Sequence, residues 1–245
     1  MIWVTGDTHG DWIHRVNMDS FPEQREMSKD DYVIILGDFG IWRDSPQQRW
    51  YLNWLEEKHF TTLFIDGNHE NYDILDSYPV EEWHGGKVHF IKPSIIHLMR
   101  GQVFDIDGLK FFTFGGAASH DISDGVLEID DPRVKEWRDN PDKMYRINHI
   151  SWWEREMPDE KEMDEGIKNL AEHNNKVDFI LTHCTASSTA ALLSHGLYKP
   201  DKLTNYLEEI RCNVDYKRWL CGHYHDNKAI TTKDIVLYEQ IVRVA

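Results

Sequence analysis

Residues 33–36 read Val-Ile-Ile-Leu, and Gly37 and Asp38 follow them directly. A run of four apolar residues, three of them β-branched, is typical of a β-strand that is buried on both faces. Glycine then ends the strand, so the carboxylate of Asp38 is expected in a tight turn at the strand's C-terminal end. Ligands of open α/β sheets bind at that end of the strands. The stretch therefore predicts an α/β fold with a polar site at one edge of a sheet.

The same arrangement recurs four more times along the chain. Each time a short apolar run ends in aspartate, asparagine or histidine. The runs are residues 2–5 before Asp7 and His9, 63–65 before Asn68 and His69, 179–182 before His183, and 218–221 before His223 and His225. One such residue would be explained by turn formation alone, because Asp and Asn favour turns. Five ordered cases favour a common site, with Asp38 at its centre.

Composition restricts the partners of this chain. The 43 acidic and 27 basic residues give a formal charge of −16, which disfavours a surface that coats long nucleic acid. No apolar run approaches the roughly 18 residues of a membrane helix. The N-terminus enters a strand at Ile2 without the segments of a secretory leader, and three cysteines suit reduced thiols. We therefore expect a cytoplasmic protein without membrane contact.

The order of the predicted elements indicates how the chain is organised. Strands and helices alternate at first, and Ser45 and Pro46 predict the N-cap and first turn of a helix that runs to about Glu57. Residues 87–114 instead hold four strand-like runs with an Asp-Gly turn at 107–108, which predicts an antiparallel meander. Residues 120–165 are irregular and are interpreted as an excursion or lid, with a solvated acidic face at 154–165. No linker divides the chain, so one domain over residues 1–245 is expected.

The polar residues at the strand ends form a set of potential metal ligands. They are Asp7, His9, Asp38, Asn68, His183, His223 and His225. All offer oxygen or imidazole nitrogen, which disfavours a thiolate zinc site and suits manganese, our first choice, or iron, zinc, cobalt or nickel. The set is too large for one ion with an open position, so it favours two divalent ions that share a carboxylate. Such a pair can clamp the attacking and leaving oxygens of a phosphoryl transfer.

In order along the chain, the D-x-H, G-D, G-N-H-[DE], strand-His and G-H-x-H elements resemble the calcineurin-like metallophosphoesterase superfamily. The resemblance implies a four-layer α/β/β/α sandwich with mixed sheets and the metal site at the C-terminal ends of the strands. It implies that a metal-bridging hydroxide attacks phosphorus, while His69 protonates the leaving group or stabilises the phosphoryl oxygens. By motif position, Asp38 bridges the metals, Asp7, His9 and His225 hold one of them, and Asn68, His183 and His223 hold the other.

One stretch departs from the pattern of the protein Ser/Thr phosphatases in this superfamily. Those enzymes follow their G-D motif with an Asp that orients the catalytic His and an Arg that grips phosphate, whereas Ile41 and Trp42 occupy these positions here. His69 therefore needs another orienting group. Guanidinium groups suit phosphate, and His120 follows a loop of small residues. The candidates for substrate contact are Arg43, Arg100, Arg146 and His120.

These features together predict a metallophosphoesterase that hydrolyses phosphomonoesters or phosphodiesters of small phosphorylated molecules or nucleotides. An alternative is a catalytically silent scaffold that keeps the fold and binds a protein partner. The presence of His69 and of the complete ligand set disfavours that alternative. A nuclease acting on long duplex DNA is disfavoured by the acidic surface.

Overall fold

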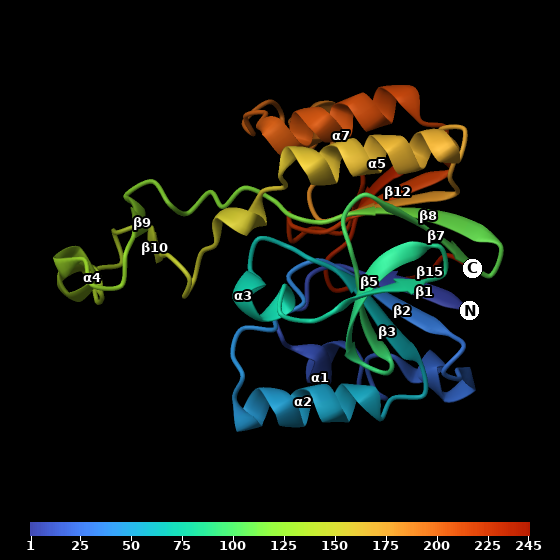
Figure 1. The fold of residues 1–245 in the computed structure, drawn as a ribbon, viewed down its shortest axis with the longest axis horizontal. Coiled ribbons are helices and arrows are strands. Elements are labelled where there is room, and N and C mark those ends of the chain that lie inside the picture. Colours follow the sequence, from blue (N-terminus) through green and yellow to red (C-terminus); the bar gives the residue numbers. More distant parts are fainter.

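The predicted strand that precedes Asp38 is β2 (Tyr32–Leu36), and all five of its residues are buried. The computed structural model, which describes residues 1–245, places β2 inside a seven-stranded sheet and adds a second sheet of six strands (Figure 1). In spatial order the first sheet contains β15 (Ile241–Arg243), β1 (Ile2–Thr5), β2, β3 (Thr61–Ile65), β6 (Ile95–Leu98), β5 (Gly86–Lys92) and β4 (Val80–Trp83). The second contains β13 (Lys228–Ala229), β14 (Asp234–Val236), β12 (Arg218–Cys221), β11 (Phe179–Thr182), β8 (Leu109–Phe114) and β7 (Gln102–Ile106).

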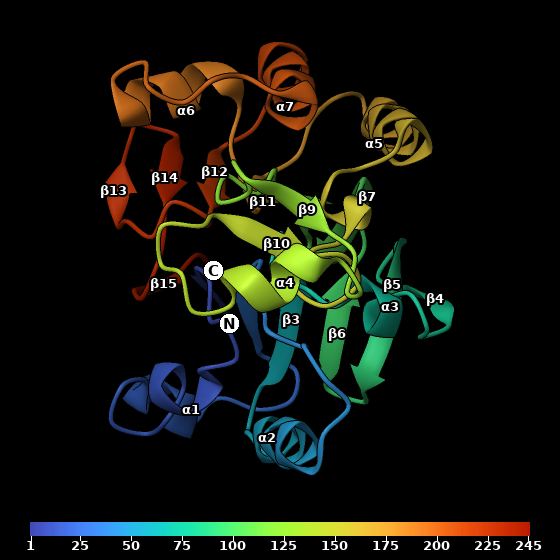
Figure 2. The same cartoon turned by 90° about the vertical axis from the view of Figure 1, so that its left-hand side faces the viewer.

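Helices cover the outer face of each sheet, so the fold is the expected four-layer α/β/β/α sandwich (Figures 1 and 2). The helices on the side of the first sheet are α1 (Trp12–Arg15), α2 (Pro46–Glu56) and the short α3 (Tyr72–Leu75). Those on the second sheet are α5 (Glu160–Glu172), α6 (Ser187–Ser194) and α7 (Lys202–Asn213). Ser45 caps α2 as predicted, because its side chain accepts a hydrogen bond from the Gln48 amide. No helix combines the length and apolar character that a membrane span needs.

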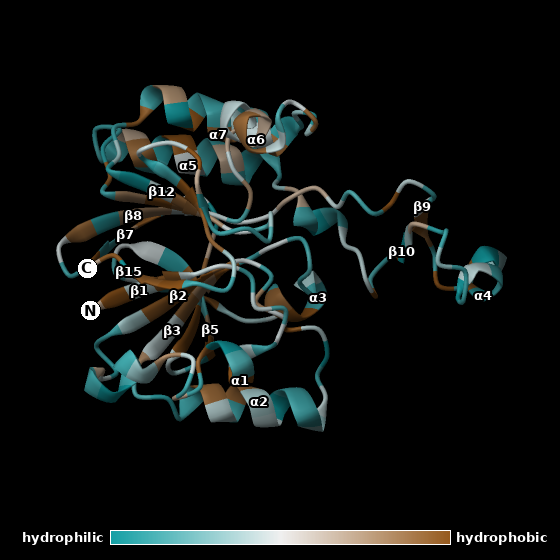
Figure 3. Cartoon of the chain, turned by 180° about the vertical axis from the view of Figure 1, so that it is seen from behind, coloured by the Kyte–Doolittle hydropathy of each residue, from teal (hydrophilic) through white to brown (hydrophobic).

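Three apolar clusters fill the three gaps between these layers. In β2, Val33 and Ile35 pack toward α1 and α2, whereas Ile34 and Leu36 pack between the two sheets. The third cluster joins the second sheet to α5 and α7, for example through Trp219. Figure 3 accordingly shows apolar strands in the middle layers and polar residues on the outer helices. Because strand residues alternate between faces, strands that are apolar throughout suit only the inner layers of such a sandwich.

The antiparallel meander predicted for residues 87–114 is wrong, although its four strands exist. β5 pairs with β6 in the first sheet, and β7 pairs with β8 in the second. The Asp-Gly turn does form a hairpin between β7 and β8, with positive φ at both Asp107 and Gly108. The local sequence pattern identifies a strand. Which sheet the strand joins depends instead on its neighbours in space, and these come from distant parts of the chain. The predicted closing hairpin, β13 with β14, is present, and β15 then returns to pair with β1.

Residues 121–152 form an arm that extends away from the body at the edge where the strands end (Figures 1 and 2). It contains a parallel pair of short strands, β9 (Gly125–Leu127) and β10 (Tyr145–Ile147), and helix α4 (Pro132–Trp137). At its base the side chains of His149 and Trp153 contact the Asp73 carboxylate at 2.9 and 2.8 Å. Short 3-10 helices lie at Pro22–Glu26 and Glu154–Glu156. The base of the arm therefore lies against the segment that follows β3.

Candidate metal centre

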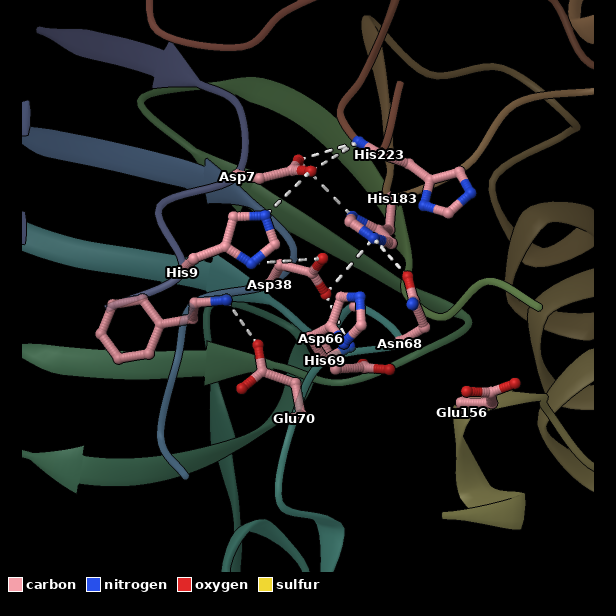
Figure 4. Close-up of polar contacts among 12 residues, drawn as sticks. Asp7, His9, Asp38, Asp66, Asn68, His69, Glu70, Glu156, His183 and His223 are labelled. Atoms are coloured by element: carbon pink, nitrogen blue, oxygen red, sulfur yellow. Dashed lines mark hydrogen bonds and ion pairs between the residues drawn. The ribbon is translucent and has the colours of Figure 1, made fainter. Parts of the chain in front are cut away.

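The two sheets bring the predicted ligands to one place. β1, β2 and β3 are mutually parallel, as are β11 and β12 in the other sheet, so the loops after these strands meet at a common edge. Figure 4 shows the side chains of Asp7, His9, Asp38, Asn68 and His183 gathered together, whereas His223 turns its amide toward Asp7 and its ring lies farther out, beyond His183. Segments as distant in sequence as residues 7 and 225 thereby come into contact.

One set of donors consists of Asp7, His9 and His225. The Nε2 atom of His225 lies 3.2 Å from a carboxylate oxygen of Asp7, and the Nε2 atoms of His9 and His225 lie 3.0 Å apart. A second set consists of Asp7, Asp38 and His183, and within each set the donor atoms lie within 4.8 Å of one another. Asp7 is common to both sets.

Asp38 belongs to the second set but also contacts a member of the first. Its Oδ1 atom is 3.4 Å from Nε2 of His183, and its Oδ2 atom is 3.7 Å from Nδ1 of His9. The carbonyl oxygen of the Asn68 side chain is 3.2 Å from the same His183 nitrogen. The His223 ring lies 5.0 Å from the His183 ring, and the His223 amide donates to Asp7. The two carboxylates thus occupy the centre of the cluster, with imidazoles on both sides.

The backbone at these positions is unusual. His9, Asp38, His223 and His225 have φ angles of 48°, 44°, 68° and 48°, and they are four of the ten non-glycine residues with positive φ in the chain. Such conformations cost about 1–3 kcal/mol each and concentrate at functional sites. The fold therefore keeps strained turns where the potential ligands sit.

The electrostatics of the cluster suit bound cations. Asp7 and Asp38 are each only 1% exposed. Burial alone would raise the pKa of Asp38, but the combined attraction to His183, His69 and His9 outweighs burial and lowers it below its usual range. Burial would likewise lower the pKa of His183, yet the Asp38 and Asp7 carboxylates raise it to about 10. Burial and repulsion from His183 lower the pKa of His223 to about 3. Buried acids of this kind require positive charge beside them.

The hydrogen-bond pattern of His183 points the same way. Its Nδ1 atom contacts the Leu36 carbonyl oxygen at 2.8 Å, and a carbonyl can only accept, so Nδ1 carries the proton. Because the pKa of His183 is raised to about 10, Nε2 also carries a proton, which it donates toward the side-chain oxygens of Asn68 and Asp38. A divalent cation would take the place of this proton among the same donors, and a hydrogen bond from the other ring nitrogen to a carbonyl is typical of metal-binding histidine. The residues present therefore fit divalent cations.

Two glycines permit these contacts. A side-chain carbon at Gly67 would overlap the main chain and carboxylate of Asp38, and one at Gly37, whose φ is +93°, would overlap the His183 ring. At Gly67 and at Gly37 the loop therefore approaches its neighbour more closely than a residue with a side chain would allow.

Sequence reasoning assigned no supporting role to three polar residues that hold the cluster in place. Glu70 is buried, and its carboxylate accepts hydrogen bonds from the amides of Phe39 and Gly40 at 2.5 and 3.3 Å, which holds the turn after Asp38. The Asn68 side chain donates to the Ser119 hydroxyl, which donates to Glu156. Glu156 is 3% exposed, so the solvated face expected at 154–165 is wrong at this position. Glu70 was visible within its motif, but no local signal marks Ser119 or Glu156.

His69 lies beside the cluster. Its amide donates to Asp38 at 2.7 Å, its ring lies 5.7 Å from that of His9, and its imidazole makes no hydrogen bond. Burial lowers the pKa of His69, and the Asp38 carboxylate opposes that shift. Ile41, at the position of the orienting Asp in the phosphatase pattern, is buried in the apolar cluster under the first sheet.

The remaining candidates differ in their surroundings. Arg43 and Arg146 line a hollow beside His69, and Arg146 is paired with Asp121. The His120 ring lies 6.1 Å from that of His223. Arg100 is 5% exposed, and its guanidinium is bound to Asp66, Tyr72 and main-chain carbonyls. The structure therefore separates Arg100 from the cluster, and the substrate contact expected for Arg100 is wrong because internal partners already bind its guanidinium.

Among solved structures, a phosphopantetheinyl hydrolase from Mycobacterium tuberculosis is similar, with a TM-score of 0.45 and 14% identity over 97% of this chain and 89% of that one. Among curated proteins no relative matches. The family model described as calcineurin-like phosphoesterase matches residues 1–227. The chain belongs to the calcineurin-like phosphoesterase family of metal-dependent hydrolases.

Proposed function

We propose that this protein hydrolyses phosphomonoesters or phosphodiesters with a dinuclear metal centre. The observation that carries the proposal is the pair of donor sets, Asp7–His9–His225 and Asp7–Asp38–His183, which share the buried carboxylate of Asp7 and also have the Asp38 carboxylate in contact with both. Asp38 would bridge the two ions, because its two oxygens face one histidine of each set. Asn68 and His223 would complete the second set.

The metals and the substrate follow from the chemistry of the donors. Oxygen and imidazole donors together suit first-row divalent ions, and we propose manganese, with iron, zinc, cobalt or nickel as alternatives. Divalent cations bound there would polarise the phosphoryl oxygens and lower the pKa of water. The substrate would be a small phosphorylated molecule or nucleotide, since the acidic chain disfavours long nucleic acid.

His69 would act as the proton donor to the leaving oxygen or as a hydrogen-bond donor to the phosphoryl group. Its amide is tied to Asp38, so its position is coupled to the bridging carboxylate. Its ring makes no internal hydrogen bond and can turn toward a substrate. We further propose that residues 1–245 act as one catalytic domain with the arm beside the site, since β15 near the C-terminus pairs with β1.

The test is metal analysis together with hydrolysis. Protein stripped with a chelator and reloaded with Mn²⁺ should hold about two ions per chain and cleave 4-nitrophenyl phosphate or bis(4-nitrophenyl) phosphate. Asp38→Asn should lower metal content and abolish turnover, whereas His69→Ala should reduce turnover with the metal retained. Asp105→Asn, the same change at an exposed carboxylate of β7, serves as the matched control.

Two results would overturn the proposal. Hydrolysis that persists both after chelation and in Asp38→Asn would show that the cluster is not the catalytic site. A metal-loaded protein that cleaves neither ester nor any nucleotide would favour the silent scaffold instead.

A further inference from the structure

Trp42 is held in a fixed position beside the candidate metal centre although 42% of it is exposed. Its indole Nε1 donates to the His69 carbonyl oxygen at 2.9 Å, and its amide donates to the side chain of Gln48 at 3.1 Å. The Asn71 side chain donates to the Trp42 carbonyl at 2.9 Å. Three hydrogen bonds therefore fix the ring and main chain of a residue that stays open to solvent.

The indole also approaches the loop of His9. A side-chain carbon at Gly10 would lie 3.6 Å from Cζ3 of Trp42, so the ring packs along that glycine. Trp42 thus spans the two loops that carry His9 and His69. An exposed aromatic side chain usually needs no explanation, but one that joins two loops of a catalytic site is placed to meet a substrate.

The ring forms part of the wall of a hollow of about 550 Å³ that reaches His9 and His69. This volume lies within the usual range for small-molecule sites. The wall contains aromatic residues together with Gln47, Ser151 and the exposed Arg43, whose guanidinium makes no ion pair. The combination of an aromatic face, polar groups and a cation matches a ligand with a planar ring, hydroxyl groups and negative charge.

The geometry points to Trp42 as a stacking platform that selects phosphoesters whose organic part carries a planar ring, with nucleoside phosphates as the class that the hollow suits. This inference rests on the proposed function, because the phosphoryl group must lie at the donor cluster for the ring to reach Trp42. A base stacks on an aromatic side chain with little dependence on its identity, so the platform selects a planar ring and not a particular base.

Binding to the Mn²⁺-loaded protein tests the platform. The phosphonate analogues of adenosine 5′-monophosphate and ribose 5-phosphate, in which CH₂ replaces the ester oxygen, are not hydrolysed and serve as the nucleotide and the sugar phosphate. They differ only at C1, which carries adenine in one and a hydroxyl group in the other, so calorimetry with both isolates the contribution of the ring. The wild-type protein should bind the nucleotide roughly tenfold or more tightly than the sugar phosphate. Trp42→Ala should remove that preference and leave the affinity for the sugar phosphate within about twofold. Trp42→Phe, which keeps a ring face but loses the hydrogen bond to His69, should retain most of it.

Trp50→Ala is the matched control, because Trp50 is 57% exposed on α2 and lies outside the wall of the hollow. Equal affinity for both ligands in the wild type, or a preference that survives in Trp42→Ala, would overturn the inference. Loss of affinity for both ligands alike in Trp42→Ala would show that Trp42 only positions the His69 loop. Hydrolysis of the nitrophenyl esters is measured separately, so failure of the proposed function is recognised independently of failure of the platform.

Discussion

Replacing Arg100 with methionine distinguishes an internal ion pair from a substrate contact. The guanidinium Nη2 atom lies 2.6 Å from Oδ2 of Asp66 and 2.8 Å from the Tyr72 hydroxyl, and both charged side chains are nearly inaccessible to solvent. Asp66 immediately precedes the loop that carries Asn68 and His69. Removing one partner of a buried pair leaves an uncompensated charge and costs about 3–5 kcal/mol. For a chain of this size we therefore expect the melting temperature to fall by about 6–20 °C.

Circular dichroism melts and urea denaturation of metal-free protein measure this effect. Arg43→Met is the control, since Arg43 is exposed and unpaired, and its stability should change by less than about 0.5 kcal/mol. Adding Asp66→Asn to Arg100→Met should recover part of the loss, because no unpaired carboxylate then remains. An Arg100→Met protein with wild-type stability and a raised KM for phosphoesters would refute this reasoning and return Arg100 to the substrate contacts.

Three further predictions concern residues around the cluster. Gly67→Ala should lower Mn²⁺ content, measured by elemental analysis, because the added methyl group overlaps Asp38 and separates the two loops; full metal occupancy would contradict this. Glu70→Ala should lower the free energy of unfolding in urea by about 1–3 kcal/mol for each buried amide left unpaired, and Glu70→Gln by less. Burial and the neighbouring His97 lower the pKa of His89 to about 4, whereas unfolded histidine titrates near 6.5. On acidification the unfolded state therefore binds a proton at a higher pH than the folded state does. The free energy of unfolding should decrease as the pH falls from about 6.5 toward 4, and at pH 5.5 it should be about 1.4 kcal/mol below its value above pH 7. His89→Asn should lose less stability than the wild type between pH 7.5 and 5.5, and an unchanged pH dependence would contradict the assignment.

The sequence by itself determined the family, the fold class and the residues that meet at the strand ends. Each of these features depends on a local pattern, an apolar strand followed by a turn with a polar residue, such as the stretch ending at Asp38. Parallel strands then carry such turns to one edge, so the meeting of Asp7 with His225 follows from strand direction.

Only the tertiary structure decided where the hairpins of residues 87–114 lie, which arginines face the site, and that Glu156 is buried. The physical reason is that burial and pairing depend on surfaces supplied by distant segments. Arg100 and Arg43 look alike in sequence. In the structure, Asp66 and Tyr72 enclose Arg100, whereas Arg43 stays exposed to solvent. The left-handed backbone of Asp38 is likewise held by Glu70, thirty-odd residues further along the chain, through contacts that no local pattern records.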